Sequence, residues 1–237
     1  MHHNAIALNG QNKIIMITFK PHQALEHIKP YLPNSPIIVE AGAYKGKETI
    51  KIATMVPQGA VHAFEAVPEI FEQLKTNTAH LSNVHCYPIA LSDTTGSSIM
   101  HLSEHPDRPG ITSQGNSLLA PKERLTLSPL IFSRTIQVPT ITLDDWAKQN
   151  TINRIDLLWL DLQGYELAVM QSSPHIFSTV QVVLTEVEFA QAYEGQPQYP
   201  EVRAWLESQG LAMIGKDFPD NPTWFFGNAL FIKNQSR

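Results

Sequence analysis

The chain has 237 residues, of which 43% are hydrophobic, 16% are charged and one is a cysteine. These values exclude a disordered chain, a coiled coil, and a fold held by internal disulfides or by a cysteine-based zinc site. The formal net charge of −5, without any cluster of Lys or Arg, argues against binding of nucleic acid through its phosphates. At roughly 150 residues per domain, we expect residues 1–237 to form a single domain with additions.

The N-terminal segment, Met1 to Thr18, has a short apolar patch but is too short and too poorly flanked for a signal peptide or a membrane span. No later segment approaches 18 uninterrupted apolar residues. Since Cys86 lies in an apolar run, where a buried inert thiol is expected, we predict a cytoplasmic protein. Residues 21–31 have the apolar spacing of a short helix, so residues 1–35 are expected to form an extension with a capping helix.

Short apolar strands then alternate with helices. Unbroken β-branched runs such as residues 37–39 are typical of strands buried on both faces of a parallel sheet. This alternation predicts a doubly wound, Rossmann-like α/β fold with a mostly parallel sheet and helices on both faces. The predicted strands cover residues 37–39, 60–64, 84–91, 135–138, 157–160, 181–187, 211–214 and 229–232. The predicted helices that follow the capping helix run from the residue after Gly46 through Met55, from Pro68 onward, from the residue after Thr142 onward, and over residues 202–206.

The pattern changes between Ser103 and Phe132, where prolines alternate with Gly, Ser and Asn and no periodicity is sustained. A loop of this length inside a compact domain is usually functional or mobile. We therefore expect an irregular insertion over residues 103–133 that acts as a lid over the substrate.

Acidic residues stand at the ends of the predicted strands. In an open α/β sheet the ligand binds beyond the carboxyl ends of the strands. Each carboxylate alone could instead stabilise a helix N-terminus, but the series as a whole favours a ligand site. Its members are Glu40, Glu65, Asp93, Asp161 and Glu186.

The first loop indicates which ligand this would be. Gly42 and Gly46 allow a close approach of the backbone, and Glu65 lies near the spacing at which an acid binds nucleotide ribose hydroxyls. The loop is not G-x-G-x-x-G, and Glu40 would repel a pyrophosphate on the following helix. These features disfavour NAD and favour a ribose-bearing cofactor with an ammonium and a sulfonium but no phosphate, a description that fits S-adenosylmethionine.

Seven segments, in order, resemble the FkbM family of S-adenosylmethionine-dependent methyltransferases. They are VEAGAYKGKET, FEAVPEIFEQLKTN, ALSDTTG, VPTITLDDW, IDLLWLDLQGYEL, LTEVEFAQAYEGQPQYPEV and GNALFI, and they extend from about Ile37 to Lys233. The resemblance implies a class I methyltransferase fold, with a seven-stranded sheet that has one antiparallel strand. It also implies methyl transfer, most often to a hydroxyl of a sugar or natural product, with S-adenosylhomocysteine as the second product.

The resemblance further implies which residues contact the cofactor. Tyr44 stands where the family more often has Asn, and Ala66 where it often has Pro. The motif matches place Glu40, Gly42, Tyr44 and Gly46 around the methionine part, Glu65 and Ala66 at the ribose, Ser92 and Asp93 near adenine, and Asp161 and Gln163 near the reacting end.

A neutral alcohol is a poor nucleophile, so a general base is expected. Asp161, after the central strand 157–160, has the best position, and a role as cofactor ligand is its alternative. Glu186 and Glu188 alternate on one strand end, so they share a face and could meet Asp161. These three acids could hold Mg²⁺, although binding to substrate hydroxyls is favoured. His105 could be the base if the insertion folds over the site, or simply a surface histidine.

Asn116 and Ser117 lie in a Gly-Asn-Ser-Leu stretch that resembles the Gly-x-Ser-Ser-Leu pattern of the family's insertion. They and Glu188 are expected to bind the acceptor, although turn formation alone would also explain Asn and Ser. Trp224 belongs to an aromatic cluster that could stack on a sugar, with packing against the sheet as its alternative. Trp159 is expected in the core.

Two further functions stay open on the sequence alone: a nicotinamide-dependent oxidoreductase, and a catalytically silent methyltransferase fold used as a binding module. The sequence leaves the oligomeric state open, a homodimer included, and it does not name the acceptor.

Overall fold

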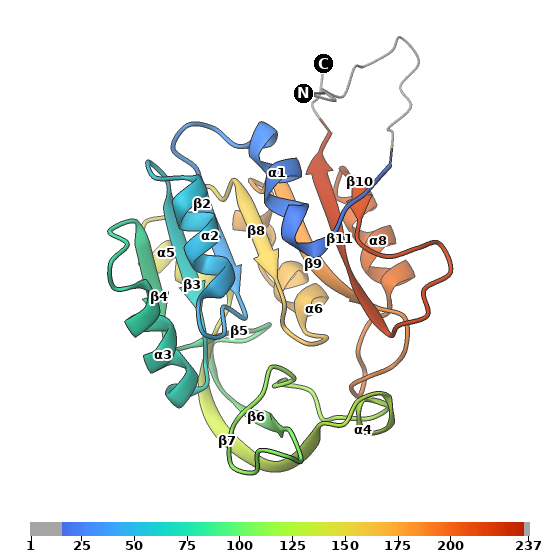
Figure 1. The fold of residues 1–237 in the computed structure, drawn as a ribbon. Helices are drawn as coiled ribbons and strands as arrows, with labels where there is room; N and C mark the ends of the chain where they lie inside the picture. The colour runs from blue at the N-terminus through green and yellow to red at the C-terminus, as the bar shows by residue number, and fades with distance from the viewer. Residues whose placement is uncertain (1–15, 235–237) are drawn as a thin grey trace.

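The structure, a computed structural model, describes residues 16–234. A mixed sheet runs through the molecule (Figure 1). Only β11 runs antiparallel to its neighbours among the strands of this sheet within the described residues. In spatial order the strands are β1 (Ile17–Thr18), β10 (Leu211–Lys216), β11 (Phe226–Lys233), β9 (Val182–Glu188), β8 (Leu157–Leu160), β2 (Ile37–Ala41), β3 (Ala60–Phe64) and β4 (Val84–Tyr87).

The doubly wound α/β fold is confirmed, including its antiparallel strand. The sheet has eight strands rather than the seven predicted, because the two residues of β1 extend it in parallel beside β10. This strand belongs to the predicted N-terminal extension, of which residues 1–15 lie outside the described part of the chain.

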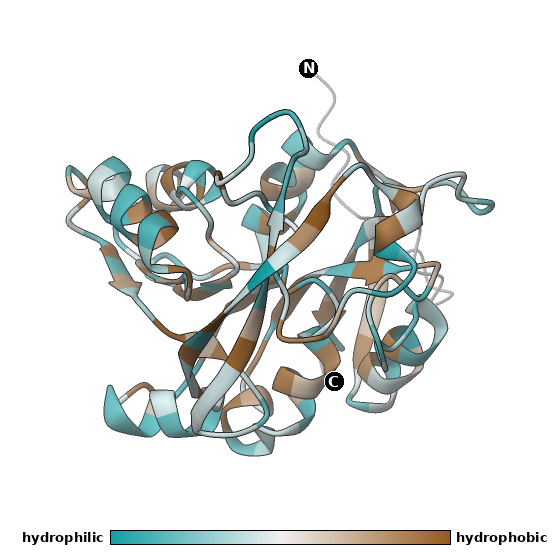
Figure 2. Ribbon diagram, turned by 90° about the horizontal axis from the view of Figure 1, so that it is seen from below, coloured by the Kyte–Doolittle hydropathy of each residue, from teal (hydrophilic) through white to brown (hydrophobic). Residues whose placement is uncertain are grey.

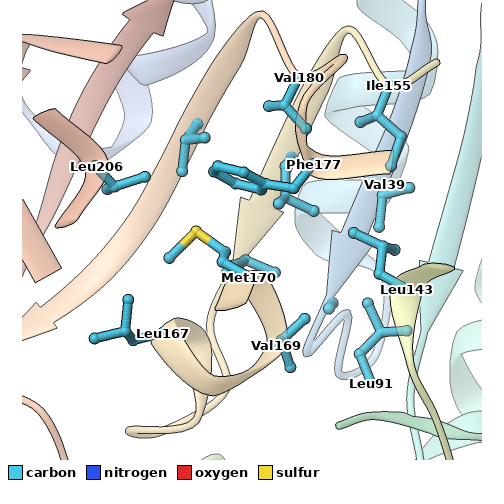
Figure 3. Close-up of a cluster of buried hydrophobic side chains, with 14 of the residues drawn as sticks. Val39, Leu91, Leu143, Ile155, Leu167, Val169, Met170, Phe177, Val180 and Leu206 are labelled. Atoms are coloured by element: carbon cyan, nitrogen blue, oxygen red, sulfur yellow. The ribbon is translucent and has the colours of Figure 1, made fainter. Parts of the chain in front are cut away.

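Helices cover both faces of the sheet. The central strands are apolar on both sides, so each face needs a covering layer. Two buried clusters join one face to the first group of helices. Another cluster, part of which Figure 3 shows, joins the other face to the second group. The first group is α1 (Ala24–Ile28), α2 (Lys47–Met55) and α3 (Pro68–Thr78); the second is α5 (Leu143–Gln149), α6 (Glu166–Gln171), α7 (Pro174–Phe177) and α8 (Tyr199–Ser208).

Local signals in the sequence set several helix starts. Pro68 occupies the first turn of α3, where its missing N–H removes no hydrogen bond. Thr142 accepts a hydrogen bond from the backbone N of Asp145 at 3.1 Å and so caps α5. The capping helix near the N-terminus is α1, flanked by 3-10 turns at Pro21–Gln23 and Lys29–Tyr31. In Figure 2 the helices carry both hydrophobic and hydrophilic residues, as expected for helices that pack by one face.

The two strands that flank the predicted insertion form a hairpin that sequence reasoning did not expect in full. A second sheet, β5 (Ala90–Leu91), β7 (Ile131–Ile141) and β6 (Gly96–Glu104), contains a long antiparallel hairpin of β6 and β7. The segment between these strands holds only the short helix α4 (Arg124–Leu127). Sequence reasoning missed β6 because its apolar residues, such as Met100 and Leu102, are few and alternate with polar ones.

None of the helices in residues 16–234 is long and apolar enough to cross a membrane. Two of the four residues of the apolar N-terminal patch, Ile14 and Ile15, lie outside the described residues, and Ile17 belongs to β1.

Candidate functional site

A cavity of about 670 Å³ opens where β2, β3 and β8 end. This is the edge at which an open α/β sheet binds its ligands. Residues from several of the predicted sites come together in its lining. They are Glu40, Gly42, Tyr44, Glu65, Ala66, Asn116, Ser117, Asp161 and Gln163.

The loop after β2 presses closely against the loop after β8. The backbone N of Gly42 donates to Phe64 O at 3.1 Å, and Gly42 has a φ of +84°. A Cβ at this position would lie 1.9 Å from the backbone oxygen of Asp161. Tyr44 also has positive φ, at +49°, which is uncommon without glycine. Glycine is therefore required at position 42 for both conformation and space.

Gly46 has a different role from the one predicted by resemblance. It does not belong to the residues that line the cavity. Its φ is +84°, and a Cβ there would come within 2.8 Å of Leu74 Cδ1 on α3. Gly46 thus allows α2 to start close to α3, and it shapes the loop from behind.

Glu40 brings a buried carboxyl to the cavity. It is 3% exposed, and its Oε2 has no hydrogen-bond partner among the described residues. The pKa of Glu40 is raised to about 8, mainly by burial and to a smaller extent by the charges of Glu48 and Asp161, while the side chain of Thr49 lowers it. A buried acid without a partner is costly. A cationic group placed in the cavity would satisfy it.

Glu65 lies at the end of β3, on the opposite side of the first loop. Its Oε1 accepts a hydrogen bond from Val67 N at 2.8 Å. Burial raises the pKa of Glu65 to about 7, while backbone hydrogen bonds lower it. The carboxyl is therefore held by the backbone and presented to the cavity, as the binding of ribose hydroxyls requires.

The surface beyond Glu65 is mostly apolar. Ala90 and Leu91 line it, whereas the predicted adenine contacts, Ser92 and Asp93, do not. Asp93 instead accepts a hydrogen bond at 2.9 Å from the hydroxyl of Tyr165, which does line the cavity. Sequence reasoning missed Tyr165, although it stands in the loop that follows Asp161.

Gln163 connects the acids at the other end of the cavity. Its Nε2 donates to Asp161 Oδ1 at 2.8 Å and to Glu186 Oε1 at 2.9 Å. Its Oε1 accepts from the hydroxyl of Tyr193 at 3.0 Å. The side-chain amide of Gln163 thus lies between the two carboxyls and donates a hydrogen bond to each. Tyr193 gave no sequence signal, because its partners are 30 or more residues away.

Hydrogen bonds with Glu166, at the start of α6, and with Ser117, in the insertion, hold the loop after β8. Glu166 accepts hydrogen bonds from Leu162 N at 2.7 Å and from Gly164 N at 3.0 Å. Ser117 donates from its hydroxyl to the backbone oxygen of Gln163 at 2.8 Å. Gln163 keeps a φ of +51° in this loop. Ser117 was predicted as an acceptor ligand; in the structure its hydroxyl holds the backbone of Gln163.

A buried arginine from the insertion balances these acids. Asp161 is exposed toward the cavity, but desolvation by the surrounding protein still raises its pKa; burial raises the pKa of Glu186, and the charge of Arg124 lowers both. Arg124 is 8% exposed, and its guanidinium lies 4.7 Å from the ring centroid of Phe225. An arginine in an irregular segment carries no signal of burial, so sequence reasoning could not have found it.

Besides Gly46, Ser92 and Asp93, four further predicted residues lie outside the cavity lining. Glu186 lies behind the lining residue Gln163 and accepts a hydrogen bond from its amide. Glu188 is buried in the same strand, and burial raises its pKa to about 8. His105 lies on the insertion, 3.4 Å from Asp107. Trp224 is 56% exposed, against Phe225 and Phe226. His105 could act as the general base only if the insertion moved so that this side chain entered the cavity.

Residues 16–234 contain no group of three or more His, Cys, Asp or Glu arranged to hold a metal ion. The facing oxygens of Asp161 and Glu186 accept hydrogen bonds from the Gln163 amide. The described acids are thus arranged as hydrogen-bond partners.

Comparison with known proteins places this geometry in context. A family model described as the methyltransferase FkbM domain matches residues 40–211, more than half of the chain. The 2-O-methyltransferase NoeI of Sinorhizobium fredii is 26% identical over 162 residues, which cover 68% of this chain and 67% of the relative. Methyltransferase sdnD of Sordaria araneosa is 27% identical over 206 residues, covering 76% and 75%.

Two solved structures share the fold. An rRNA methylase from Streptococcus thermophilus superposes with a TM-score of 0.51 at 12% identity, covering 93% of this chain and 99% of the other. The methyltransferase FkbM from Methylobacillus flagellatus superposes with a TM-score of 0.50 at 12% identity, covering 84% of this chain and 44% of the other.

Proposed function

Since the chain belongs to the FkbM family of methyltransferases, we propose that it transfers the methyl group of S-adenosylmethionine to a hydroxyl of a sugar or another small natural product. The observation that carries this proposal is the pair of buried carboxyls, Glu40 and Glu65, on two sides of the Gly42 loop. Together they suit a ligand with an ammonium at one end and a ribose further along.

The donor set supports this cofactor. Glu40 offers an unpaired carboxyl oxygen to the ammonium, and Gly42 leaves space that a Cβ would fill. Glu65 is oriented for the ribose hydroxyls, and Ala66, Ala90 and Leu91 offer apolar contact for the adenine. The carboxyl of Glu40 disfavours a pyrophosphate on the same loop, which argues against a nicotinamide-dependent oxidoreductase.

At the reacting end, Asp161 is the proposed base. When bound, S-adenosylmethionine supplies a methyl group made electrophilic by the sulfonium. An acceptor hydroxyl would take this methyl group, with S-adenosylhomocysteine as the leaving product, and Asp161 would take the hydroxyl proton. Gln163 holds Asp161 in place through the 2.8 Å hydrogen bond, and the cavity aligns the two reactants.

Three finer points complete the proposal: the role of the insertion, the accepting atom and the extent of the domain. The insertion supplies Asn116, Ser117 and Leu118 to the cavity wall, which fits its proposed role as a lid over residues that bind the acceptor. The relative NoeI is named a 2-O-methyltransferase, which favours oxygen as the accepting atom. We also propose that residues 1–237 act as one catalytic domain.

Calorimetric titration with S-adenosylhomocysteine tests the cofactor site. Glu65→Gln should weaken binding roughly 10- to 100-fold, because a hydrogen bond to a charged group contributes about 1.5–3 kcal/mol. Glu72→Gln, an exposed acid on α3, is the matched control and should bind as the wild type does. Absence of binding by the wild type would contradict the proposal, and saturable NADH binding would favour the oxidoreductase. Cofactor binding without methylation of any hydroxyl acceptor would favour a silent binding module.

A further inference from the structure

The cavity has an arm that the proposed cofactor contacts leave free. Beyond Glu40 it continues over the face of the sheet, with Trp159 and Leu184 in its lining. Glu40 is paired with Trp159 across β2 and β8, and Trp159 with Leu184 across β8 and β9. Residues directly opposite one another point to the same face. These three side chains therefore form one row across the centre of the sheet.

Trp159 was expected in the core, and the structure shows a second role. It packs against the buried cluster beneath α1 and α2, yet it is only partly buried and lines the arm. Trp159 precedes Asp161 by two residues, or about 7 Å along the chain at roughly 3.3 Å per residue. The distance between the indole and the proposed base is thus about the size of one sugar ring.

The walls of the arm come from the elements on either side of β8. Figure 1 shows α1 and α2 on the same face of the sheet, with β8 passing between them. The segment of Phe19, Pro21, His22 and Leu25 forms one wall, and the first turns of α2, with Lys51, form the other. The floor is apolar, whereas part of the rim can donate hydrogen bonds.

A second hollow adjoins this arm. It measures about 250 Å³, and it shares Pro21 and Asn228 with the larger cavity. Its lining includes Trp224, which is 56% exposed, and Phe226. The two hollows therefore meet at Pro21 and Asn228, with Trp159 in the lining of one and Trp224 in the lining of the other.

The geometry points to an oligosaccharide as the methyl acceptor. Its reacting ring stacks on Trp159 and directs a hydroxyl at Asp161, and the rings that follow leave past Pro21 toward Trp224. This assignment rests on the proposed methyl transfer. A pyranose ring has an apolar C–H face and hydroxyls around its edge, which match an indole floor with a polar rim. Two adjoining hollows, each with a tryptophan, provide more room than a single ring needs.

Titration of the protein saturated with S-adenosylhomocysteine tests this assignment by calorimetry and saturation-transfer NMR. The probes are methyl glucopyranoside, methyl mannopyranoside, the trisaccharides maltotriose, cellotriose and mannotriose, and phenol. We expect the trisaccharide of at least one series to bind about fivefold or more tightly than its single ring. Trp159→Leu should weaken both at least about tenfold, and Trp224→Leu should remove only the advantage of the trisaccharide. Trp205→Leu, on α8 at the opposite face of the sheet, should change neither.

Unchanged saccharide binding in a Trp159→Leu protein that still binds S-adenosylhomocysteine would overturn the assignment. Failure of every saccharide to bind, or tighter binding of phenol, would overturn it as well. If Trp159→Leu loses S-adenosylhomocysteine, the exposed wall variant His22→Ala decides instead, with an expected loss of about threefold in saccharide affinity. Loss of S-adenosylhomocysteine binding by the wild type would contradict the proposed function itself and not the acceptor assignment.

Discussion

The two ends of the cavity are built in different ways. At the Glu40–Glu65 end, the loops after β2 and β3 shape the site mostly through their own backbone, as in the hydrogen bond from Val67 N to Glu65. At the Asp161 end, the site depends on side chains from distant segments, namely Ser117, Tyr193 and Arg124, which act on Asp161 and on its neighbour Gln163. The first end is therefore set by local sequence, whereas the second exists only when the chain has folded.

Loss of the proposed base should have the largest effect on the Asp161 end. Asp161→Asn keeps the shape of the side chain but cannot take a proton, so kcat should fall roughly 10²- to 10⁴-fold. Steady-state kinetics with a methylated saccharide product measures this. Asp107→Asn, an exposed acid of the insertion, is the control and should keep full activity. A kcat within fivefold of the wild type would assign the base to another residue.

The tight contact between the two ends can be broken at Gly42. Gly42→Ala should lower the free energy of unfolding by roughly 3–5 kcal/mol, since its Cβ would meet the Asp161 backbone and its φ is +84°. Gly110→Ala is a matched control, because Gly110 has a φ of +79° but nothing within 4 Å of the added Cβ. That variant should lose only about 1 kcal/mol. Equal losses in denaturant unfolding would show that space around Gly42 is unimportant.

The buried acid at the Glu40 end should make the cofactor-free protein sensitive to pH. The folded-state pKa of Glu40, about 8, exceeds its ordinary value of 4.5, so the folded state holds a proton in this window that the unfolded state has released. Stability should therefore fall as pH rises from 4.5 to 8, by roughly 1.4 kcal/mol per pH unit for one such group.

Glu40→Gln should reduce this slope by about one proton, measured by urea unfolding across the pH range. Glu26→Gln, an exposed acid on α1, should leave the slope as it is in the wild type. An unchanged slope in Glu40→Gln would mean that the carboxyl is ionised in the folded protein.

A smaller effect is expected from the insertion. Arg124→Met removes the charge that lowers the pKa of Asp161, Glu186 and Glu188, so the ionised base should become available only at higher pH. Activity at pH 7 should fall about fivefold, or ~1 kcal/mol, and return as the pH is raised. Arg124→Lys should restore the wild-type profile.

Arg134→Met serves as the control for that substitution, because Arg134 lies on the same hairpin but pairs with Glu104 at 2.6 Å. If both variants have the same pH profile, Arg124 has only a packing role.

The contrast between the two ends also explains how far the sequence could lead. The acids that follow the strands, and glycine at position 42, are signals within a few residues. They predicted the edge of the sheet at which the cavity opens and several of its lining residues, such as Glu40, Glu65 and Asp161. Gly46, Ser92 and Asp93, which the resemblance implies as cofactor contacts, are not among the residues that line the cavity, although Asp93 accepts a hydrogen bond from Tyr165, which is.

The remaining parts depend on contacts far apart in the chain. Arg124 and Tyr193 reach the acids because the insertion pairs with the segment after β9, as in the hydrogen bond from Lys122 N to Ala192 O. β6 was hidden by its polar residues, and Trp159 resembled any core residue of a central strand. No local pattern carries such information, because it arises from which segments meet.

The backbone contact between Gly42 and Asp161 has a consequence for how such enzymes diversify. The proposed methyl-donor site follows β2 and the proposed base follows β8. Because these strands are neighbours, the distance between the two sites is set by the spacing between adjacent strands. The walls around the acceptor, by contrast, come from the segment before β2 and from the insertion. Evolution can therefore exchange these walls, and with them the molecule that is methylated, while the geometry of the transfer is passed on unaltered.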